Sequence, residues 1–414
     1  MSGLRSVEEH VAALLFGLAP LPAVSRATPH ALGLVLAEAA VARLDLPGFD
    51  NSAMDGYAVR AAECAAAAGA DASESGGFRL PVCADIAAGD TRRHVLAPGS
   101  AARIMTGAPM PEGADAVVPV EDSDGGVDEV TLRRVPEVGR HVRPRGEDVR
   151  SGQQLLEAGL LLTPGRIALL AAGNVDHVLV HPRPRVTVLS TGDELIPLGD
   201  QPTHGQIIDS NQLMLAALVD AAGGALAHSG RLPDEPGAVR AAFLDPPGEP
   251  DLVLTSGGVS MGAHDTVKEV LREAGGVDFV KVAMRPGMPQ GGGRIGRDRT
   301  IPIVTLPGNP VSSFVSFHVF VLPVLRRLAG REGDPAGGLN LEEAVAGASW
   351  RGVEGRVEFT RVHVRDGIAH PERGQGSHMV GALAAANALA VLPAPTFAVT
   401  EGDRLRIIPF VGEA

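Results

Sequence analysis

A glycine-rich turn follows an apolar run in the second half of the chain. The run DLVLT covers residues 251–255 and leads directly into SGGVSMG at residues 256–262. Glycine lacks a Cβ, so the backbone of such a turn can approach a ligand closely and aim successive N–H groups at an anion. The candidate ligand-binding residues of this turn are Ser256, Gly257, Gly258 and Ser260. A tight turn between a strand and a helix explains the glycines equally well, because the segment is neither a P-loop nor a GxGxxG motif.

The segment LPGNPVSS at residues 306–313 predicts a second, stiffer corner. Its candidate ligand-binding residues are Pro307, Gly308, Asn309, Pro310 and Ser312. The two prolines restrict the backbone and so fix the amides around them. Asn309 is also placed to cap a helix that begins at Pro310, and helix capping alone is the competing explanation.

Three carboxylates follow predicted strands: Glu194 in STGDE, Asp234 in RLPDE and Asp265 in SMGAHD. In an open parallel sheet such positions converge at the carboxyl edge, where ligands bind. Carboxylates gathered beside a phosphate need a hard cation, and Mg²⁺ with its water ligands meets that need. Taken singly, each acid is explained by a helix cap or by exposure to solvent, so the metal site depends on all three.

Two basic side chains, Lys281 and Arg285, are four residues apart on a segment predicted to be extended. With that spacing they point to the same face and can neutralise an anionic ligand. A solvated sheet edge is the alternative. Four further polar residues are not singled out by periodicity: Asp55, Thr106, Arg361 and Ser377.

The composition restricts the class of partner. The chain has 36 Lys and Arg against 49 Asp and Glu, a formal net charge of −13. That charge opposes non-specific binding to nucleic acid or to an anionic membrane, so neither is an expected partner. An anionic ligand would need local Arg, Lys, backbone N–H groups or a bound cation to reverse the field.

Cysteine use and hydropathy indicate the compartment. Cys64 and Cys83 form neither a disulfide framework nor a spaced metal-binding set, which suits a reducing environment. The chain does not open with a signal-peptide pattern. The most apolar helical stretch, 311–325, contains His318 and Pro323 and is expected to fall short of a membrane span. We therefore expect a soluble, cytoplasmic protein.

The first half of the chain predicts a helical, linking region with a β-rich insertion. Residues 6–18 predict an amphipathic helix with a capping box at Ser6, and residues 31–42 predict a second helix. Between residues 46 and 139 short apolar runs alternate with Gly, Pro and Asp, which favours a β-rich domain. A helical pattern returns at 164–172.

From residue 186 apolar strands alternate with helices. Strands are predicted at 186–190, from 226, and at 251–255, 279–284 and 301–306, with helices at 210–222, 234–244, 265–274 and 310–329. This order predicts a parallel, doubly wound sheet. After a predicted linker at 330–338 the pattern is that of β-structure. The fold class is α/β plus β: a multidomain chain with a central doubly wound α/β/α domain, smaller β-rich domains and an N-terminal helical and linking region.

The ordered set of motifs resembles the molybdopterin molybdenumtransferase (molybdenum insertase) family, which is related to the C-terminal domain of gephyrin. The motifs are DGYAV at 55–59, RIMTGAPMPEGADAVV at 103–118, RGEDV at 145–149, STGDE at 190–194, TSGGVSMGAHD at 255–265, LPGNPVSS at 306–313 and GQGSH at 374–378. Any one of them is weak evidence, but the set follows the order of the family and spans nearly the whole chain.

The resemblance implies four domains and an elongated homodimer. The boundaries are 1–45 and 140–185 for a discontinuous N-terminal helical and linking domain, 46–139 for a β-rich inserted domain, 186–330 for an α/β molybdopterin-binding domain and 331–414 for a C-terminal β-barrel-like domain. In the implied dimer the central domain faces the partner's β-rich parts. The upstream adenylyltransferase and the molybdoenzymes that accept the product are further expected partners.

The implied activity is insertion of molybdenum from molybdate into adenylylated molybdopterin, with Mg²⁺-dependent cleavage of the adenylate and release of AMP. Carried over residue by residue, the catalytic set is Asp55, Glu194, Asp234, Asp265, Lys281 and Arg285, with Glu194, Asp234 and Asp265 as Mg²⁺ ligands. The substrate-binding set adds Thr106, Arg361 and Ser377 to the residues of both corners. We expect no nucleophilic side chain, because phosphate displacement needs positioning and charge neutralisation.

One stretch departs from the family pattern. Where the family has KPGKP and then an aromatic-containing run, this chain has RPGMP at 285–289, then Gln290 and the glycines 291–293. Arg285 keeps the charge in a forked form, whereas Met288 removes a charge and the glycines remove a hydrophobic wall. We expect a looser pocket or a slightly different ligand there.

Two other functions remain open. The chain could adenylylate molybdopterin, although that reaction is associated with the central domain alone. A degenerate, non-catalytic scaffold or assembly protein is the second alternative, against which the retained acids and the LPGNP segment argue.

Overall fold

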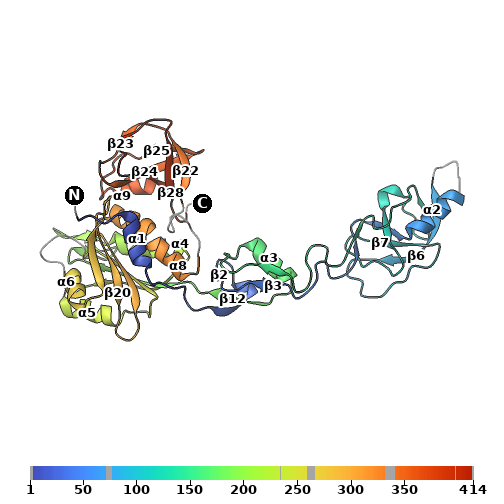
Figure 1. The fold of residues 1–414 in the computed structure, drawn as a ribbon, viewed down its shortest axis with the longest axis horizontal. Coiled ribbons are helices and arrows are strands. Elements are labelled where there is room, and N and C mark those ends of the chain that lie inside the picture. Colours follow the sequence, from blue (N-terminus) through green and yellow to red (C-terminus); the bar gives the residue numbers. More distant parts are fainter. Residues whose placement is uncertain are drawn as a thin grey trace.

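The computed structural model describes residues 3–70, 77–233, 235–258, 266–331, 341–396 and 398–412. The chain is elongated, with a central α/β domain and the C-terminal β domain together at one end (Figure 1). A small linking domain lies in the middle, and a β-rich domain, here called the distal domain, lies at the far end. The predicted multidomain combination of one α/β domain with smaller β domains is confirmed.

Six strands form the sheet of the central domain, in the order β16-β13-β17-β21-β20-β18. Their bounds are β13 Arg185–Thr191, β16 Ala225–Leu232, β17 Leu252–Ser256, β18 Val277–Lys281, β20 Pro289–Ile295 and β21 Ile301–Leu306. β16, β13, β17 and β21 are parallel, as predicted. The expectation of a parallel sheet is wrong at the other edge, where β20 and β18 run antiparallel. Strand β20 was not predicted, because its glycines give it no apolar alternation.

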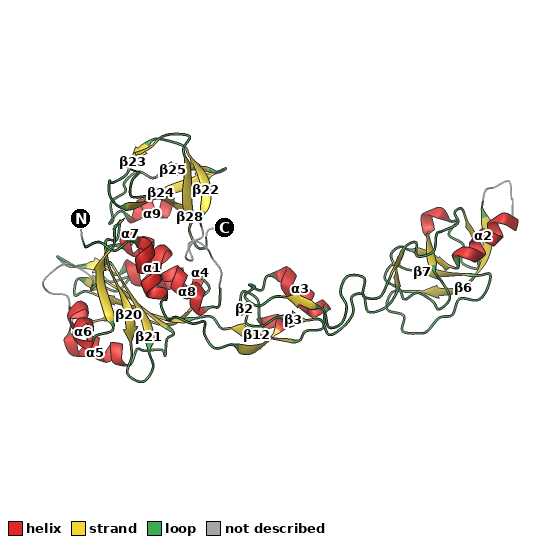
Figure 2. Ribbon diagram, viewed as in Figure 1, coloured by secondary structure: helices red, strands yellow, loops and turns green. Residues whose placement is uncertain are grey.

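Helices cover both faces of this sheet (Figure 2). One face packs against α4 (Ser210–Ala221) and a long apolar helix, and the other against α5 (Pro236–Leu244) and α6 (Thr266–Ala274). Neighbouring residues of one strand enter opposite cores, since Val188 lies in the first and Leu189 in the second. Strands covered on both faces are mostly apolar along their length, and the helices on both faces confirm the doubly wound prediction. A small parallel pair, β14 (Leu195–Ile196) and β15 (Ile207–Ile208), follows β13.

The long apolar helix is continuous over 19 residues. It comprises α7 (Pro310–Ser316), the π-helical turn η3 (Phe317–Val321) and α8 (Leu322–Leu328). The prediction that His318 and Pro323 leave this stretch short of a membrane span is wrong, because by length and composition alone the helix qualifies. Since 89% of its most apolar window is buried, it is the core helix of this domain.

The first helix, α1 (Val7–Leu15), forms as predicted, with a complete capping box. Glu9 N donates to Ser6 Oγ at 3.0 Å, and Ser6 N donates to Glu9 Oε2 at 2.8 Å. The predicted boundaries place this helix in the linking domain. Its apolar side, including Leu14, instead packs into the core of the central domain. The apolar spacing of the helix predicts a buried face without identifying what buries it.

Leu14 occupies space that the glycines of β20 leave open. A Cβ on Gly292 would lie 2.2 Å from Leu14 Cδ2. A Cβ on Gly291 would lie 2.1 Å from Thr305 Oγ1. The hydrophobic wall that these glycines lack is therefore replaced, at Gly292, by a side chain from the start of the sequence.

The helix predicted over residues 31–42 is absent. This region forms the short η1 (Thr28–His30), β2 (Val35–Leu36) and β3 (Ala40–Val41), with β1 (Val24–Ala27) before them. Strand β12 (His177–His181) lies between β1 and β2, and β3 pairs with β11 (Gln154–Leu156). Pairing with strands more than a hundred residues away overrides the helical propensity of the local alanines and leucines. The helix predicted at 164–172 is confirmed as α3 (Pro164–Ala172).

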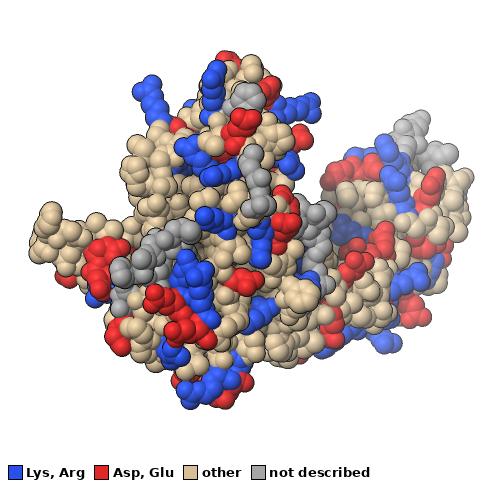
Figure 3. Space-filling view, turned by 60° about the vertical axis from the view of Figure 1, so that its left-hand side comes forward, with Lys and Arg blue, Asp and Glu red and all other residues tan. Residues whose placement is uncertain are grey.

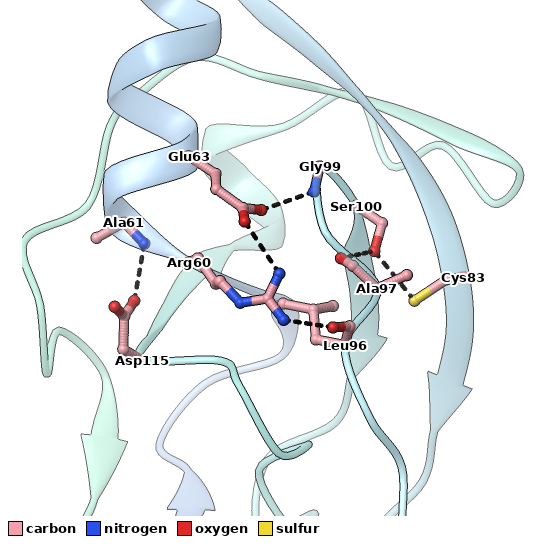
Figure 4. Close-up of polar contacts among 9 residues, drawn as sticks. All are labelled: Arg60, Ala61, Glu63, Cys83, Leu96, Ala97, Gly99, Ser100 and Asp115. Carbon is pink, nitrogen blue, oxygen red and sulfur yellow. Dashed lines mark hydrogen bonds and ion pairs between the residues drawn. The ribbon is translucent and has the colours of Figure 1, made fainter.

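The distal domain is a five-stranded sheet with one helix, α2 (Ala61–Ala70). Its strands are β5 Gly56–Val59, β6 Phe78–Ile86, β7 Ala101–Ile104, β8 Ala116–Pro119 and β9 Glu129–Leu132, with η2 (Val120–Asp122) and the pair β4 (Asn51–Ser52) and β10 (Val142–Arg143) beside them. Figure 4 shows how side chains fix the start of α2. Ala61 N donates to Asp115 Oδ1 at 2.7 Å, and Gly99 N donates to Glu63 Oε2 at 2.7 Å. The first bond satisfies one of the free N–H groups at the start of the helix, and the second attaches its first turn to the loop at Gly99.

The C-terminal domain closes into a barrel, as predicted. Its strands are β22 Glu342–Ala346, β24 Val357–Arg365, β25 Ile368–Pro371, β26 Ala388–Leu392 and β28 Arg404–Pro409, with α9 (Val380–Ala385) and the pair β23 (Trp350–Arg351) and β27 (Ala398–Val399) outside the ring. The order β24-β25-β22-β28-β26 is closed by pairing of β26 with β24. β19 (Met284–Arg285), from the central part of the chain, adds to β24 in parallel. The two domains thus share a backbone-bonded junction.

Two histidines are buried beside the long helix. His318 lies in η3, where its Nδ1 donates to Phe314 O at 3.0 Å and its Nε2 accepts from Val411 N at 3.3 Å. His10 of α1 packs edge-on against Phe320, and within the described part of the chain neither of its ring nitrogens has a hydrogen-bond partner. Burial lowers the pKa of each imidazole to about 4, with Arg5 adding to the effect at His10 and Arg326 at His318.

We predict that Leu14 and Gly292 are energetically coupled. Leu14→Ala should destabilise the protein by about 2–5 kcal/mol through the cavity it opens. Gly292→Ala alone should cost about 1–3 kcal/mol through overpacking, and less when Leu14 is already alanine. Denaturant unfolding of the two single variants and the double variant measures the coupling. Gly165→Ala in α3, whose Cβ meets no atom within 4 Å, is the control; strictly additive effects would contradict the contact.

We predict that His10 makes the fold acid-sensitive. Between pH 6.5 and about 4 the unfolded chain binds a proton that folded His10 does not, so stability is complete above pH 6.5 and falls as the pH is lowered. His10→Leu should remove up to about 3 kcal/mol of that loss. Thermal unfolding from pH 7.5 to 4 measures the difference, with exposed His30→Leu as the control. Equal pH slopes for wild type and His10→Leu would disprove the prediction.

Candidate functional site

The two predicted corners lie side by side at the carboxyl edge of the central sheet. The first corner (residues 256–258) follows β17, and the second corner (residues 307–310) follows its parallel neighbour β21. Gly257 N donates to Leu306 O at 3.1 Å, and a Cβ on Gly308 would lie 3.8 Å from Gly257 Cα. Open parallel sheets bind ligands at this edge. Ser260, the last predicted residue of the first turn, lies outside the described residues.

The glycines of the first corner are required by the fold itself. Gly257 and Gly258 have φ values of +91° and +77°. A Cβ would lie 2.6 Å from Thr191 O at Gly257 and 2.6 Å from Val267 Cβ at Gly258. Chain reversal therefore accounts for these two glycines, whether or not a ligand binds. Gly308 differs, because its Cβ would meet only an ordinary van der Waals contact.

Asn211, in the first turn of α4, joins the two corners. Its Nδ2 donates to Ser256 Oγ at 2.7 Å and to Gly308 O at 2.7 Å. The side chain is buried, and Oδ1 has no hydrogen-bond partner among the described residues. Sequence reasoning missed Asn211 because it lies within a well-predicted helix. Its place in the first turn, two residues after the buried cap Asp209, is the signal that could have found it.

Asn309 connects the second corner to the C-terminal domain. Helix α7 begins at Pro310 with Asn309 at its N-cap position, as predicted, but the Asn309 side chain makes no capping hydrogen bond, so capping does not account for the asparagine side chain. Its Nδ2 instead donates to Ser377 Oγ at 3.1 Å, and Val311 N donates to Ser377 O at 3.2 Å. A carbonyl of another domain thus satisfies one of the free N–H groups of the helix. Ser312, predicted as a ligand contact, is buried.

Arg361 holds the loop that presents Ser377. The residue is 1% exposed, and its guanidinium donates to the carbonyl oxygens of Gly374, Gly376 and Met379 at 2.6 to 3.5 Å. Burial lowers its pKa, an effect that nearby Glu372 opposes. In this arrangement Arg361 positions the loop, and its donors point at the loop and away from solvent.

The structure describes one of the three predicted metal ligands. Glu194 is exposed beyond the end of β13, and its side chain has no hydrogen bond or ion pair among the described residues. Asp234 and Asp265 lie outside the described residues. Helix α5 is capped by Glu235, whose carboxylate accepts from Gly237 N and Ala238 N at 3.0 and 2.8 Å. Within the described ranges the structure contains no cluster of three or more His, Cys, Asp or Glu suited to a metal.

The predicted basic pair is divided between two sheets. Lys281 ends β18 of the central sheet, whereas Arg285 lies in β19, which belongs to the sheet of the C-terminal domain. The expectation that both lie on one continuous extended segment is therefore wrong. The break falls at Val282, whose N donates to Met288 O at 2.7 Å. Both basic side chains are exposed, at the junction of the two domains.

Asp55 and Thr106 pair with each other in the distal domain. Thr106 N and Oγ1 both donate to Asp55 Oδ1 at 2.7 Å. The backbone hydrogen bond, followed by that of the hydroxyl, lowers the pKa of the exposed Asp55 carboxyl. Because the distal domain lies at the opposite end of the molecule from the central domain (Figure 1), Asp55 and Thr106 are not near the corners of the same molecule.

Charge is mixed over the visible surface of the central and C-terminal domains. Figure 3 shows Lys and Arg side chains interspersed with Asp and Glu, without one continuous basic band on that face. A basic band is the usual footprint of nucleic-acid binding. An anion at the corners would therefore depend on local amides and a few local cations.

Three family models match successive parts of the chain. They are described as the MoeA N-terminal region (domain I and II) at residues 5–173, a probable molybdopterin binding domain at 187–327, and the MoeA C-terminal region (domain IV) at 343–410.

Similar proteins cover almost the whole chain. Molybdopterin molybdenumtransferase 2 of Mycobacterium tuberculosis is 42% identical over 412 residues, covering 98% of this chain and 99% of that protein. The molybdopterin molybdenumtransferase of Haemophilus influenzae is 35% identical, with 92% of each chain covered. The crystal structure of a molybdopterin biosynthesis MoeA protein from Pyrococcus horikoshii superposes with a TM-score of 0.82 and 30% identity, covering 99% of this chain and 100% of that one.

We predict that Gly308→Ala separates ligand approach from folding. A Cβ at Gly308 fits the structure without a clash, so the melting temperature should change little. If the second corner meets its ligand through backbone, the added methyl should weaken ligand binding about tenfold or more, equivalent to about 1.4 kcal/mol. Gly257→Ala is the contrasting variant and should lower the melting temperature, because its Cβ clashes with Thr191 O. Unchanged affinity in Gly308→Ala would show that ligand does not approach this backbone.

Proposed function

Because this chain belongs to the MoeA family of molybdopterin molybdenumtransferases, transferases of molybdenum cofactor biosynthesis, we propose that it inserts molybdenum from molybdate into adenylylated molybdopterin. In the proposed reaction water attacks the phosphoanhydride of the adenylate, so that AMP leaves and molybdopterin keeps its own phosphate. Molybdate exchanges two of its oxygens, lost as water, for the two dithiolene sulfurs without a change of oxidation state. The observation that carries this proposal is the contact between the two corners, at the edge where parallel sheets bind ligands.

The corners suit a phosphate-bearing substrate in an acidic protein. The formal charge of −13 disfavours binding of anions at long range. Backbone N–H groups can nevertheless donate hydrogen bonds to a phosphate at short range. Lys281 and Arg285, exposed at the junction with the C-terminal domain, supply positive charge locally. Cleavage of a phosphoanhydride depends on such positioning and charge neutralisation, which explains why no nucleophilic side chain is proposed.

The donor set fits Mg²⁺, which prefers carboxylate oxygens and retains water ligands. Glu194 offers an exposed carboxylate without a protein partner among the described residues, at the end of β13. With Asp234 and Asp265, which lie outside the described residues, it would hold the ion. Bound Mg²⁺ would neutralise phosphate charge as the leaving AMP gains it.

We propose that Asp55 and Thr106 act from a second subunit of a cytoplasmic homodimer. Their carboxylate and hydroxyl are linked by two hydrogen bonds and exposed on the distal domain. In one chain that domain lies at the opposite end from the corners, so a contribution to the same substrate requires a partner.

A mass balance tests the proposed function. Purified protein would receive adenylylated molybdopterin, molybdate and Mg²⁺, and AMP and metal-bound pterin would be measured together. We expect equal amounts of both products, and loss of both without Mg²⁺ or in Glu194→Gln.

Two results would contradict the proposal. Pyrophosphate release from ATP and molybdopterin, without metal insertion, would favour the adenylyltransferase alternative. Tight binding of the adenylylated substrate without any turnover would favour the scaffold alternative.

A further inference from the structure

The amide of Asn211 has a fixed orientation. Gly308 O can only accept a hydrogen bond, so the atom of Asn211 that faces it at 2.7 Å must be the NH₂ group. The same nitrogen lies 2.7 Å from Ser256 Oγ. One group therefore contacts both corners, whereas Oδ1 is buried without a partner among the described residues.

Burial of Oδ1 without a partner among the described residues is unfavourable for stability. A buried polar atom without a hydrogen bond costs about 1–3 kcal/mol. An unfavourable feature of this kind is characteristic of functional sites, where geometry takes precedence over stability. What the side chain provides in exchange is the separation of the two corners.

The surrounding contacts make that separation rigid. Asp209 caps α4 by accepting from Gln212 N at 3.1 Å, and it also accepts from Ser190 Oγ at the end of β13. Leu215, one turn along α4, is fully buried in the core. Helix α4 is thus fixed to the rest of the central domain both before Asn211, through Asp209, and after it, through Leu215.

We propose that Asn211 is a positioning residue that holds the first and second corners at the spacing needed to bind one substrate molecule through both. This inference rests on the proposed function for the identity of the substrate, adenylylated molybdopterin. It assigns to Asn211 no contact with the reacting atoms. It predicts that removing the amide allows the corners to move independently and weakens binding of a ligand that needs both.

The first test uses the protein without ligand. Hydrogen exchange should become faster in peptides covering Gly257 and Gly308 when Asn211 is replaced by alanine. Leu215→Ala, which destabilises the same helix by about 2–5 kcal/mol without touching either corner, is the matched stability control. Exchange at the corners that responds equally to both variants would overturn the proposal.

The second test measures affinity for adenylylated molybdopterin, at a temperature where every variant is fully folded. Asn211→Ala should weaken binding about tenfold or more, while Leu215→Ala and the neighbouring Gln212→Ala should retain wild-type affinity. Equal affinity of wild type and Asn211→Ala would refute the inference while leaving the proposed function intact. A wild-type protein that neither binds the substrate nor releases AMP would refute the proposed function instead, and the exchange experiment would still decide the role of Asn211.

Asn211→Asp gives a signature that a merely structural role would not produce. An ionised aspartate cannot donate to Gly308 O, but a protonated one can, and burial raises the pKa of a carboxyl group. The affinity of this variant should therefore recover as the pH is lowered from 8 to 5.5, while that of the wild type stays constant. A variant whose affinity is independent of pH would show that donation to Gly308 O is not the operative interaction.

Discussion

The proposed binding of a polyanion by an acidic protein is the constraint that best accounts for the geometry of the candidate site. The chain carries a formal charge of −13, so long-range attraction cannot concentrate an anionic substrate. The remaining resource is the backbone, whose N–H groups carry partial positive charge without net charge. Placing two such corners at the ends of neighbouring parallel strands, β17 and β21, concentrates donors at one edge of the sheet. Most of the site geometry serves to keep these two loops in register.

The second corner is held from three directions. Asn211 connects it to the first corner, and its Asn309 is hydrogen-bonded to Ser377 of the C-terminal barrel. The loop that carries Ser377 is in turn fixed by the buried guanidinium of Arg361. The barrel is itself attached to the central domain through the pairing of β19 with β24. Asn309, Ser377 and Arg361, which the sequence indicates as ligand contacts, are thus linked to one another and together support the second corner.

Short-range sequence patterns predicted correctly those elements whose formation depends on neighbouring residues. The capping box at Ser6, the helix at 164–172 and the strands and helices around both corners follow from short-range periodicity, and all are present. Residues 31–42 were mispredicted because their strands pair with distant segments, and β20 was missed because its glycines give no apolar alternation. Asn309 was assigned to a cap because the sequence shows its neighbours along the chain, whereas its partner is in another domain. Asn211 escaped notice for the same reason, since its two partners are 45 and 97 residues away.

The docking of α1 has a consequence for how the protein is made. During synthesis this helix is made before the linking and distal domains, whereas its binding surface, including Gly292 and the long apolar helix, is translated only after them. The apolar side of α1 therefore stays uncovered until the central domain has been translated, while two other domains fold in between. The core of the central domain therefore joins residues from α1 to Phe410, and it is complete only when segments from both sides of the linking and distal domains are present.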